Sequence, residues 1–267
     1  MRLQTRIEIL LVLFSLLSPN APAQTQSSVQ SAASLEGASL PPQQIVKNLE
    51  ERNAQRAAAL VGFAGTRVYR MQYRGLPSDR DAEMTVNVTY HAPDVKQFTI
   101  VSETGSKFII DHVFKKLLEG EQEAANEENR RKTALSSENY DFSPAGYEDS
   151  PDGGRYIFEL EPKTRNRFLY HGKIWIDAKD FAVVRMEGEP GKNPSFWIKK
   201  TNIAHQYVKV NEFWLPQENH TESVIRLGGR ATLSIEYRDY KIMKANQGAE
   251  VGEVRGDPKA SQASESR

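Results

Sequence analysis

Apolar and polar residues alternate along most of the chain between about residues 82 and 242. The clearest run has apolar residues at every second position, namely Ala82, Met84, Val86, Val88 and Tyr90. Similar runs occupy residues 95–101, 155–161, 167–177, 181–187, 195–209, 213–227 and 230–242. Successive side chains of a strand point to opposite faces, so each run predicts a β-strand with one apolar face. Turn residues such as Pro93-Asp94 separate the runs, which predicts an antiparallel meander of at least eight strands.

Two segments show helical spacing instead. Between Pro41 and about Gly62, apolar residues recur at three- and four-residue steps, and proline is tolerated in a first helical turn. The second segment, 108–135, has a first half with large apolar residues at Ile109, Val113, Phe114 and Leu117. Its second half, 119–132, is almost wholly charged or alanine. We expect the first half to pack against the sheet and the second half to be a solvated helix or an ordered loop.

The apolar face of the predicted sheet must be buried against other elements. Two amphipathic helices are too few to cover a flat sheet of this size, so the sheet should curl around them. The sequence therefore predicts an α+β fold: a curled antiparallel sheet, or incomplete β-barrel, with helices packed on or plugging its concave face. The space between sheet and helices is the natural place for a ligand.

We expect alternate residues of the central strands to line an apolar cavity. The candidates share one face within each strand, and they are Met84, Val86, Val88, Tyr90, Tyr156, Phe158, Leu160, Ile174, Ile176, Leu233, Ile235 and Tyr237. Segment 108–135 would cross the mouth of the cavity as a lid, through Ile109, Val113, Phe114 and Leu117. Only weak surface pairs could hold its second half, so the lid should have a fixed root and a loose far end. A packed core would use the same residues, and that alternative stays open.

The N-terminal segment has the composition of an export signal. Arg2 and Arg6 precede an apolar run at 9–17, which is about half of the ~20 residues needed to span a bilayer. Ala21-Pro22-Ala23 then offers the small residues that signal peptidase recognises. We expect residues 1–23 to be a signal peptide that is cleaved near Ala23.

One domain is expected between two polar segments. Residues 24–40 are rich in serine, glutamine and alanine, and residues 244–267 carry no aromatic side chain. Such composition cannot bury enough apolar surface to fold, which predicts a disordered linker and a disordered tail. The remaining stretch, 41–243, is the predicted domain, and it contains the insertion 108–135.

Composition and charge exclude several classes of function. The 267 residues include 35 basic and 35 acidic side chains, and zero net charge argues against a broad nucleic-acid surface. The chain has no cysteine, which excludes a disulfide framework, an iron–sulfur cluster, a cysteine nucleophile and a lipid-modified N-terminal cysteine. Export without cysteine fits a bacterial periplasm better than a eukaryotic secreted domain.

Catalytic motifs are missing from the sequence. The chain has no P-loop, dinucleotide-binding fingerprint, zinc-protease motif or nucleophile elbow. The five histidines lack metal-ligand spacing, and we interpret them as polar residues at strand surfaces or strand ends: His91, His112, His171, His205 and His220. Asp177 and Asp180 flank a turn, where capping of the turn is favoured over acid–base catalysis. We therefore expect no catalytic residue, no cofactor and no metal.

The segments between Arg155 and Tyr240 carry a family resemblance. RYIFELEPK, HGKIWIDAKDFAVVRMEGEP, FWLPQENHTES and LSIEYRDY resemble late strands of the outer-membrane lipoprotein-sorting (LolA/LolB-like) family. The similarity extends over roughly residues 41–242 and includes the related sigma-E regulatory (RseB-type) sensor domain. The resemblance implies an incomplete barrel whose concave face holds acyl chains, or which senses lipid-like signals and binds a membrane-bound partner. No individual residue carries over from the family.

Three functions follow from these observations. The favoured one is a periplasmic, non-enzymatic carrier or sensor that binds lipid or lipoprotein acyl chains in an apolar cavity. The second is an interaction module that binds a membrane-bound regulator of envelope stress, and the third is an envelope hydrolase. The expected partners are a lipid or acylated lipoprotein and an inner-membrane transporter or regulator. We expect a monomer that binds no nucleic acid.

Overall fold

The computed structural model describes most of the predicted domain. It covers residues 40–124, 127–149, 153–166, 168–192, 195–226 and 228–243, without the side chains of residues 123, 127 and 128. The predicted signal peptide, all but Leu40 of the predicted linker, and the predicted tail lie outside these residues.

The predicted helical segments and the eight predicted strands occur in the expected order, and two further strands accompany them. The helical elements are α1 (Pro42–Ala59), α2 (Lys107–Ile109), the π-helical turn η1 (Ile110–Phe114), α3 (Lys115–Ala124) and α4 (Glu127–Thr133). The first strands are β1 (Gly62–Gly75), β2 (Arg80–His91), β3 (Val95–Gly105), β4 (Tyr140–Glu148) and β5 (Arg155–Pro162). The later strands are β6 (Tyr170–Asp177), β7 (Val183–Pro190), β8 (Ile198–Val210), β9 (Phe213–Ile225) and β10 (Gly229–Met243).

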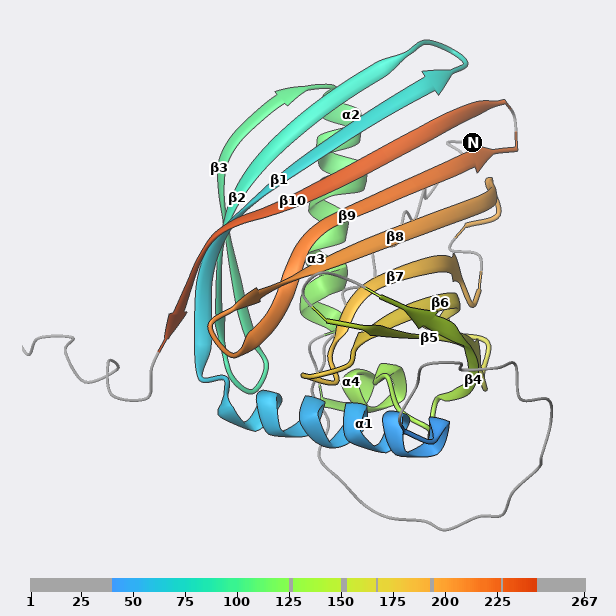
Figure 1. Ribbon diagram of the computed structural model, residues 1–267. Helices are drawn as coiled ribbons and strands as arrows, with labels where there is room; N and C mark the ends of the chain where they lie inside the picture. Colours follow the sequence, from blue (N-terminus) through green and yellow to red (C-terminus); the bar gives the residue numbers. More distant parts are fainter. Residues whose placement is uncertain are drawn as a thin grey trace, which may run out of the picture.

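The strands form one antiparallel sheet. Its order is β3-β2-β1-β10-β9-β8-β7-β6-β5-β4, so β3 and β4 are the two edges and the sheet is not closed into a barrel. The sheet curls around α3, while α1 and α4 lie at one end of it (Figure 1). The predicted fold class, a curled open sheet with helices on its concave face, is confirmed.

Two of the ten strands were not singled out by the sequence patterns. In β1, Arg67 is buried at a position where the alternation requires an apolar residue, and it therefore obscures the pattern. In β4 a register shift between Pro144 and Gly146 interrupts the pairing with β5. Such irregularities change which face a residue occupies and so hide the period of two.

Helix α1 packs on the half of the sheet that contains β4 to β8. Pro41 occupies the position before the first turn, and the helix buries Ile45, Val46 and Leu49. These side chains join apolar residues of β4 to β8 in a cluster that we call the α1 cluster. Arg56, near the end of the helix, donates hydrogen bonds of 2.9 Å to the carbonyl oxygens of Asp180 and Phe181. Helix α1 is therefore fastened to the connection between β6 and β7.

The segment between β3 and β4 covers the other half. Its helical character confirms the prediction for 108–135, and its apolar side chains pack on β1, β2 and β10 in what we call the α3 cluster. The Lys115 N–H donates to the Ile110 carbonyl, five residues back, which marks the π turn. In the described part of the chain, no helix combines the length and the apolar character needed to cross a membrane.

Candidate ligand site on the concave face

All the predicted lining and lid residues are buried, with at most 5% of any of them exposed. They fall into three groups. The α1 cluster holds Tyr156, Phe158, Leu160, Ile174 and Ile176. The α3 cluster holds Met84, Val86, Val88, Leu233, Ile235 and Tyr237 together with the lid residues Ile109, Val113, Phe114 and Leu117. Tyr90 belongs to a smaller third cluster. The lid residues thus pack directly on the strands they were expected to cover, and ligand binding there stays a prediction.

A buried ion pair joins α3 to the sheet. Nη1 of Arg67 on β1 lies 2.7 Å from both carboxylate oxygens of Glu121, and the two side chains are 4% and 1% exposed. Nζ of Lys96 on β3 lies 3.4 Å from the same carboxylate, with 10% of its side chain exposed. The expectation that 119–132 is solvated and loosely held is therefore wrong for Glu121. Two cations of the sheet compensate for the loss of water around its charge.

The ionisation of these groups reflects their burial. Burial works to lower the pKa of Arg67, but Glu121 and the neighbouring tyrosines hold it well above its ordinary value. Burial lowers the pKa of Lys96, and Glu121 opposes this while Arg67 reinforces it. We call Arg67, Lys96 and Glu121 the charge cluster. With all three ionised, it carries one positive charge in excess.

Two aromatic rings pack on the Arg67 guanidinium. The guanidinium carbon of Arg67 lies 4.9 Å from the ring centre of Tyr237 on β10 and 5.6 Å from that of Phe98 on β3. The hydroxyl of Tyr237 is buried and has no hydrogen-bond partner among the described residues. By contrast, the hydroxyl of nearby Tyr240 donates to the Pro216 carbonyl at 2.8 Å. Tyr237 thus leaves one donor unused beside the charge cluster.

A second group of buried polar side chains lies on β8 and β9. We call this group, which consists of Thr201, His205, Asn219, Thr221 and Ser223, the polar row. The Asn219 amide nitrogen lies 3.0 Å from Nδ1 of His205, and the Thr221 hydroxyl donates to Oδ1 of Asn219 at 3.0 Å. The interpretation of His205 as a surface histidine is wrong: it shares the inner face with Ile203 and Tyr207, and burial lowers its pKa to about 4. It is therefore neutral at pH 7.

In the turn between β6 and β7, the predicted capping is confirmed for Asp177, whereas the Asp180 carboxylate accepts a hydrogen bond from Nε1 of Trp214 at 2.9 Å and pairs with Lys209. Oδ1 of Asp177 accepts hydrogen bonds from the backbone N–H groups of Lys179 and Asp180, at 2.9 and 2.7 Å. Within the described residues, histidines and carboxylates form no group of three that could hold a metal ion.

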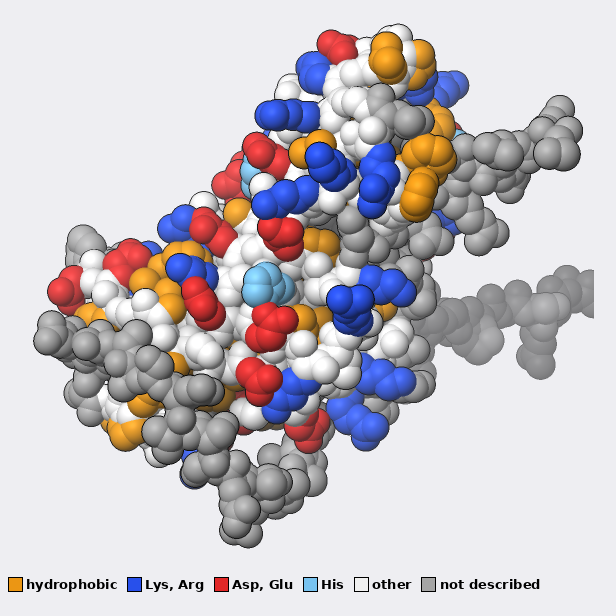
Figure 2. Space-filling view, turned by 90° about the vertical axis from the view of Figure 1, so that its right-hand side faces the viewer, with side chains coloured by type: hydrophobic (Ala, Val, Ile, Leu, Met, Phe, Trp, Pro, Cys, Tyr) orange, Lys and Arg blue, Asp and Glu red, His pale blue; other side chains and the backbone are white. Residues whose placement is uncertain are grey.

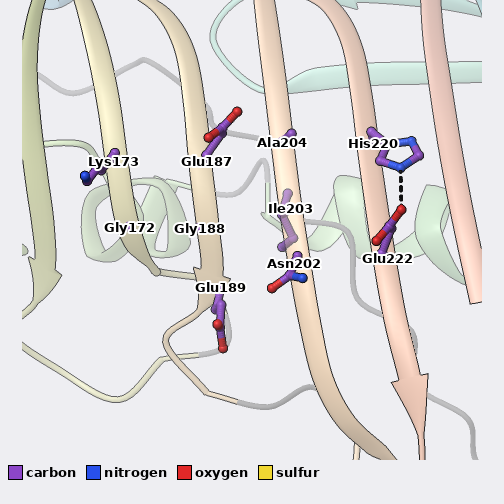
Figure 3. Close-up of a pocket in the computed structure, with 10 residues that line it drawn as sticks. All are labelled: Gly172, Lys173, Glu187, Gly188, Glu189, Asn202, Ile203, Ala204, His220 and Glu222. Atoms are coloured by element: carbon purple, nitrogen blue, oxygen red, sulfur yellow. Dashed lines mark hydrogen bonds and ion pairs between the residues drawn. The ribbon is translucent and has the colours of Figure 1, made fainter. Parts of the chain in front are cut away.

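A pocket of about 420 Å³ lies on β6 to β9. Its lining residues are Gly172, Lys173, Glu187, Gly188, Glu189, Asn202, Ile203, Ala204, His220 and Glu222. In Figure 3 the helices lie behind these strands, so the charged side chains project from the face that the helices leave uncovered. None of the predicted lining residues takes part in this pocket.

Two glycines form the floor of this pocket, and ion pairs surround it. Gly172 pairs with Gly188 across β6 and β7, and a Cβ at Gly188 would lie 2.2 Å from the His171 carbonyl oxygen. The strands therefore approach closely where both residues are glycine. Glu189 pairs with Lys200 at 2.9 Å, and His220 lies 3.3 Å from Glu222. Figure 2 shows the same mixture of basic and acidic side chains on the side of the molecule that it displays.

No family model matches the sequence, and no curated protein matches it. Solved structures do resemble the chain. One is a domain from Vibrio parahaemolyticus assigned to outer-membrane lipoprotein sorting, with 11% identity, a TM-score of 0.37, and coverage of 78% of this chain and 95% of that one. The LolA superfamily protein NE2245 from Nitrosomonas europaea has 12% identity, a TM-score of 0.34, and coverage of 77% and 95%. MucB in complex with MucA has 9% identity, a TM-score of 0.23, and coverage of 75% and 100%.

The first two of these structures carry the name of the family that the strand patterns between Arg155 and Tyr240 resemble. The fold of this chain is defined by its own strand order. What each neighbour binds is a property of that neighbour.

Proposed function

We propose that the chain binds the acyl chain of a lipid or lipoprotein on its concave face, as a non-enzymatic carrier or sensor in the bacterial periplasm. One observation supports this most directly. A single helical segment between β3 and β4, rather than a second sheet, covers the apolar face of β1, β2 and β10. Such a cover can separate from the sheet without breaking any strand pairing.

The packing of the segment suits this role. Phe114 is fully buried and its ring centre lies 5.8 Å from that of Tyr69 on β1. The π turn places Phe114 and Val113 together against the sheet, and π turns occur often at functional sites. An acyl chain that entered here would replace contacts between apolar side chains by contacts of the same kind, at little net cost.

Native mass spectrometry of gently purified protein tests the proposal, together with titration by hexadecanol as a neutral apolar probe. We expect co-purifying acyl species and saturable binding of hexadecanol. Phe114→Ala should change the hexadecanol affinity, because it alters the apolar face of the lid. Phe196→Ala is the matched control, since that ring is 75% exposed. A protein without acyl species and without saturable binding would contradict the proposal.

The exposed edge of the sheet supports a second candidate, an interaction module for a membrane-bound regulator. Strand β3 is an edge strand, and its Ile100 and Val101 are 40% and 56% exposed. An edge offers unpaired N–H and C=O groups to which an extended segment of a partner can add as a further strand. A protein bound in stoichiometric amount in the same mass spectra, lost on Val101→Pro, would favour this candidate over the first.

A further inference from the structure

The charge cluster is electrostatically incomplete. Arg67 and Lys96 supply two positive charges and Glu121 supplies one negative charge, all with side chains at most 10% exposed. Among the described residues, no other carboxylate pairs with these two cations. An uncompensated charge away from water is costly, so a site of this kind favours one further anion.

A hydrogen-bond donor without a partner belongs to a residue that packs on Arg67. The Tyr237 ring stacks on the Arg67 guanidinium, and its hydroxyl has no partner among the described residues. Buried hydroxyls normally find an acceptor, and the hydroxyl of Tyr240 does so with a backbone carbonyl. An excess cation and an unused donor together match one carboxylate or phosphate oxygen pair.

The surroundings of the charge cluster are apolar on one side. Tyr69 and Tyr237, which contact or approach Arg67, also belong to the α3 cluster beneath the lid residues. A ligand that reached the charge cluster would therefore present an apolar part to Phe114 and Val86, and a polar head to Lys96. An apolar surface beside a charged group suits an amphiphile better than a free inorganic anion.

We propose that the charge cluster and the Tyr237 hydroxyl bind the negatively charged head of an acidic amphiphile whose chain lies in the α3 cluster. This inference rests on the proposed function, because it names the class of ligand that the concave face accepts. The head is a carboxylate in the simplest case. Lys96 and Tyr237 donate to it, and Arg67 stays paired with Glu121.

Head-group selectivity of the unaltered protein is the first test. Hexadecanoate, hexadecanol and hexadecyltrimethylammonium have the same chain and differ in head charge, and acetate and inorganic phosphate supply the anion without a chain. We expect hexadecanoate to bind at least about tenfold more tightly than hexadecanol. The cationic amphiphile should bind most weakly of the three, and the two small anions should bind far more weakly than hexadecanoate.

The possible outcomes separate the two proposals. Equal binding of hexadecanoate and hexadecanol would overturn the head-group inference and leave the proposed function standing. Absence of binding by every amphiphile would overturn both. Inorganic phosphate that binds as tightly as hexadecanoate would show an anion site that needs no chain, which also overturns the inference.

Two tyrosine variants then assign the head group to its place. Tyr237→Phe removes a hydroxyl that has no partner, so the free energy of unfolding should not fall, while the preference for hexadecanoate over hexadecanol should shrink several-fold. Tyr240→Phe is the matched control, which removes a satisfied hydroxyl and should leave that preference unchanged. Glu121→Gln raises the positive charge of the cluster and should strengthen hexadecanoate binding if the variant folds. A Tyr237→Phe variant with the full preference would overturn the inference.

Discussion

Arg67 and Arg70 lie three residues apart on the same strand and should respond very differently to replacement by methionine. Arg67 points to the concave face, where Glu121 accepts two hydrogen bonds from its Nη1. Arg70 points to the opposite face and pairs with Glu83 at 2.7 Å and Glu236 at 3.1 Å, with 43% of its side chain exposed. The two arginines share a strand, and Arg70 has two carboxylate partners where Arg67 has one, so a greater cost at position 67 must come from its burial.

The expected magnitudes follow from that difference. Arg67→Met leaves the buried carboxylate of Glu121 with Lys96 and the Tyr69 hydroxyl, each at 3.4 Å, and breaking a buried pair from one side costs about 3–5 kcal/mol. Domains of ordinary stability unfold with about 5–15 kcal/mol, so this variant should lose a large fraction of its stability. Arg70→Met should lose less than about 1 kcal/mol, because exposed ion pairs contribute little.

Urea unfolding followed by tryptophan fluorescence measures both variants. The triple variant Arg67→Met, Lys96→Met and Glu121→Leu should regain much of the loss, because apolar side chains of similar size then replace the whole charge cluster at little cost. Equal losses for Arg67→Met and Arg70→Met would refute the reasoning, since burial of the ion pair would then carry no energetic weight. A triple variant less stable than Arg67→Met alone would refute it as well.

The remaining predictions concern pH and two glycines. Burial lowers the pKa of His205 to about 4 from an ordinary value of 6.5, so the unfolded chain takes up this proton first as the pH falls. Its contribution to stability is complete above pH 6.5 and is lost toward pH 4, by up to roughly 3 kcal/mol. Urea titrations at pH 7 and pH 5 should therefore differ less for His205→Gln than for His220→Gln, the exposed control. Gly120→Ala, where no atom lies within 4 Å of an added Cβ, should raise the thermal unfolding temperature by removing a flexible residue from α3. Gly188→Ala should lower that temperature, because its Cβ would meet the His171 carbonyl oxygen.

The alternation of apolar residues was sufficient to predict the fold class. Strand β2 has buried residues at every second position, and β10 repeats the pattern from Ala231 to Tyr237. The lining and lid candidates came from the same alternation and spacing, which is why all of them are buried. These residues can hold a ligand only if the helical segment separates from the sheet. The alternation of apolar residues predicts their burial and carries no information on such a movement.

The charged part of the site could not be found in the same way. Glu121 lies in a run of charged residues, EGEQEAANEENRRK, where its neighbours look locally identical to it. Only the packing of α3 on β1 to β3 brings this carboxylate to Arg67 and Lys96. Two other signals were present in the sequence. Arg67 stands in phase with Tyr69 and Met71, and His205 stands in phase with Ile203 and Tyr207. A polar residue in the apolar phase of a strand marks a buried polar group.

The connection between β3 and β4 has a consequence for the integrity of the fold. These strands are consecutive in the chain but form the opposite edges of the sheet (Figure 1). A cut in this connection would leave one fragment with α1 and β1 to β3, and another with β4 to β10. The long pairing of β1 with β10 spans the two fragments, and α1 packs on strands of the other one. The halves of the chain are thus interleaved, and this is the arrangement from which two separately expressed fragments can reassemble into one folded protein.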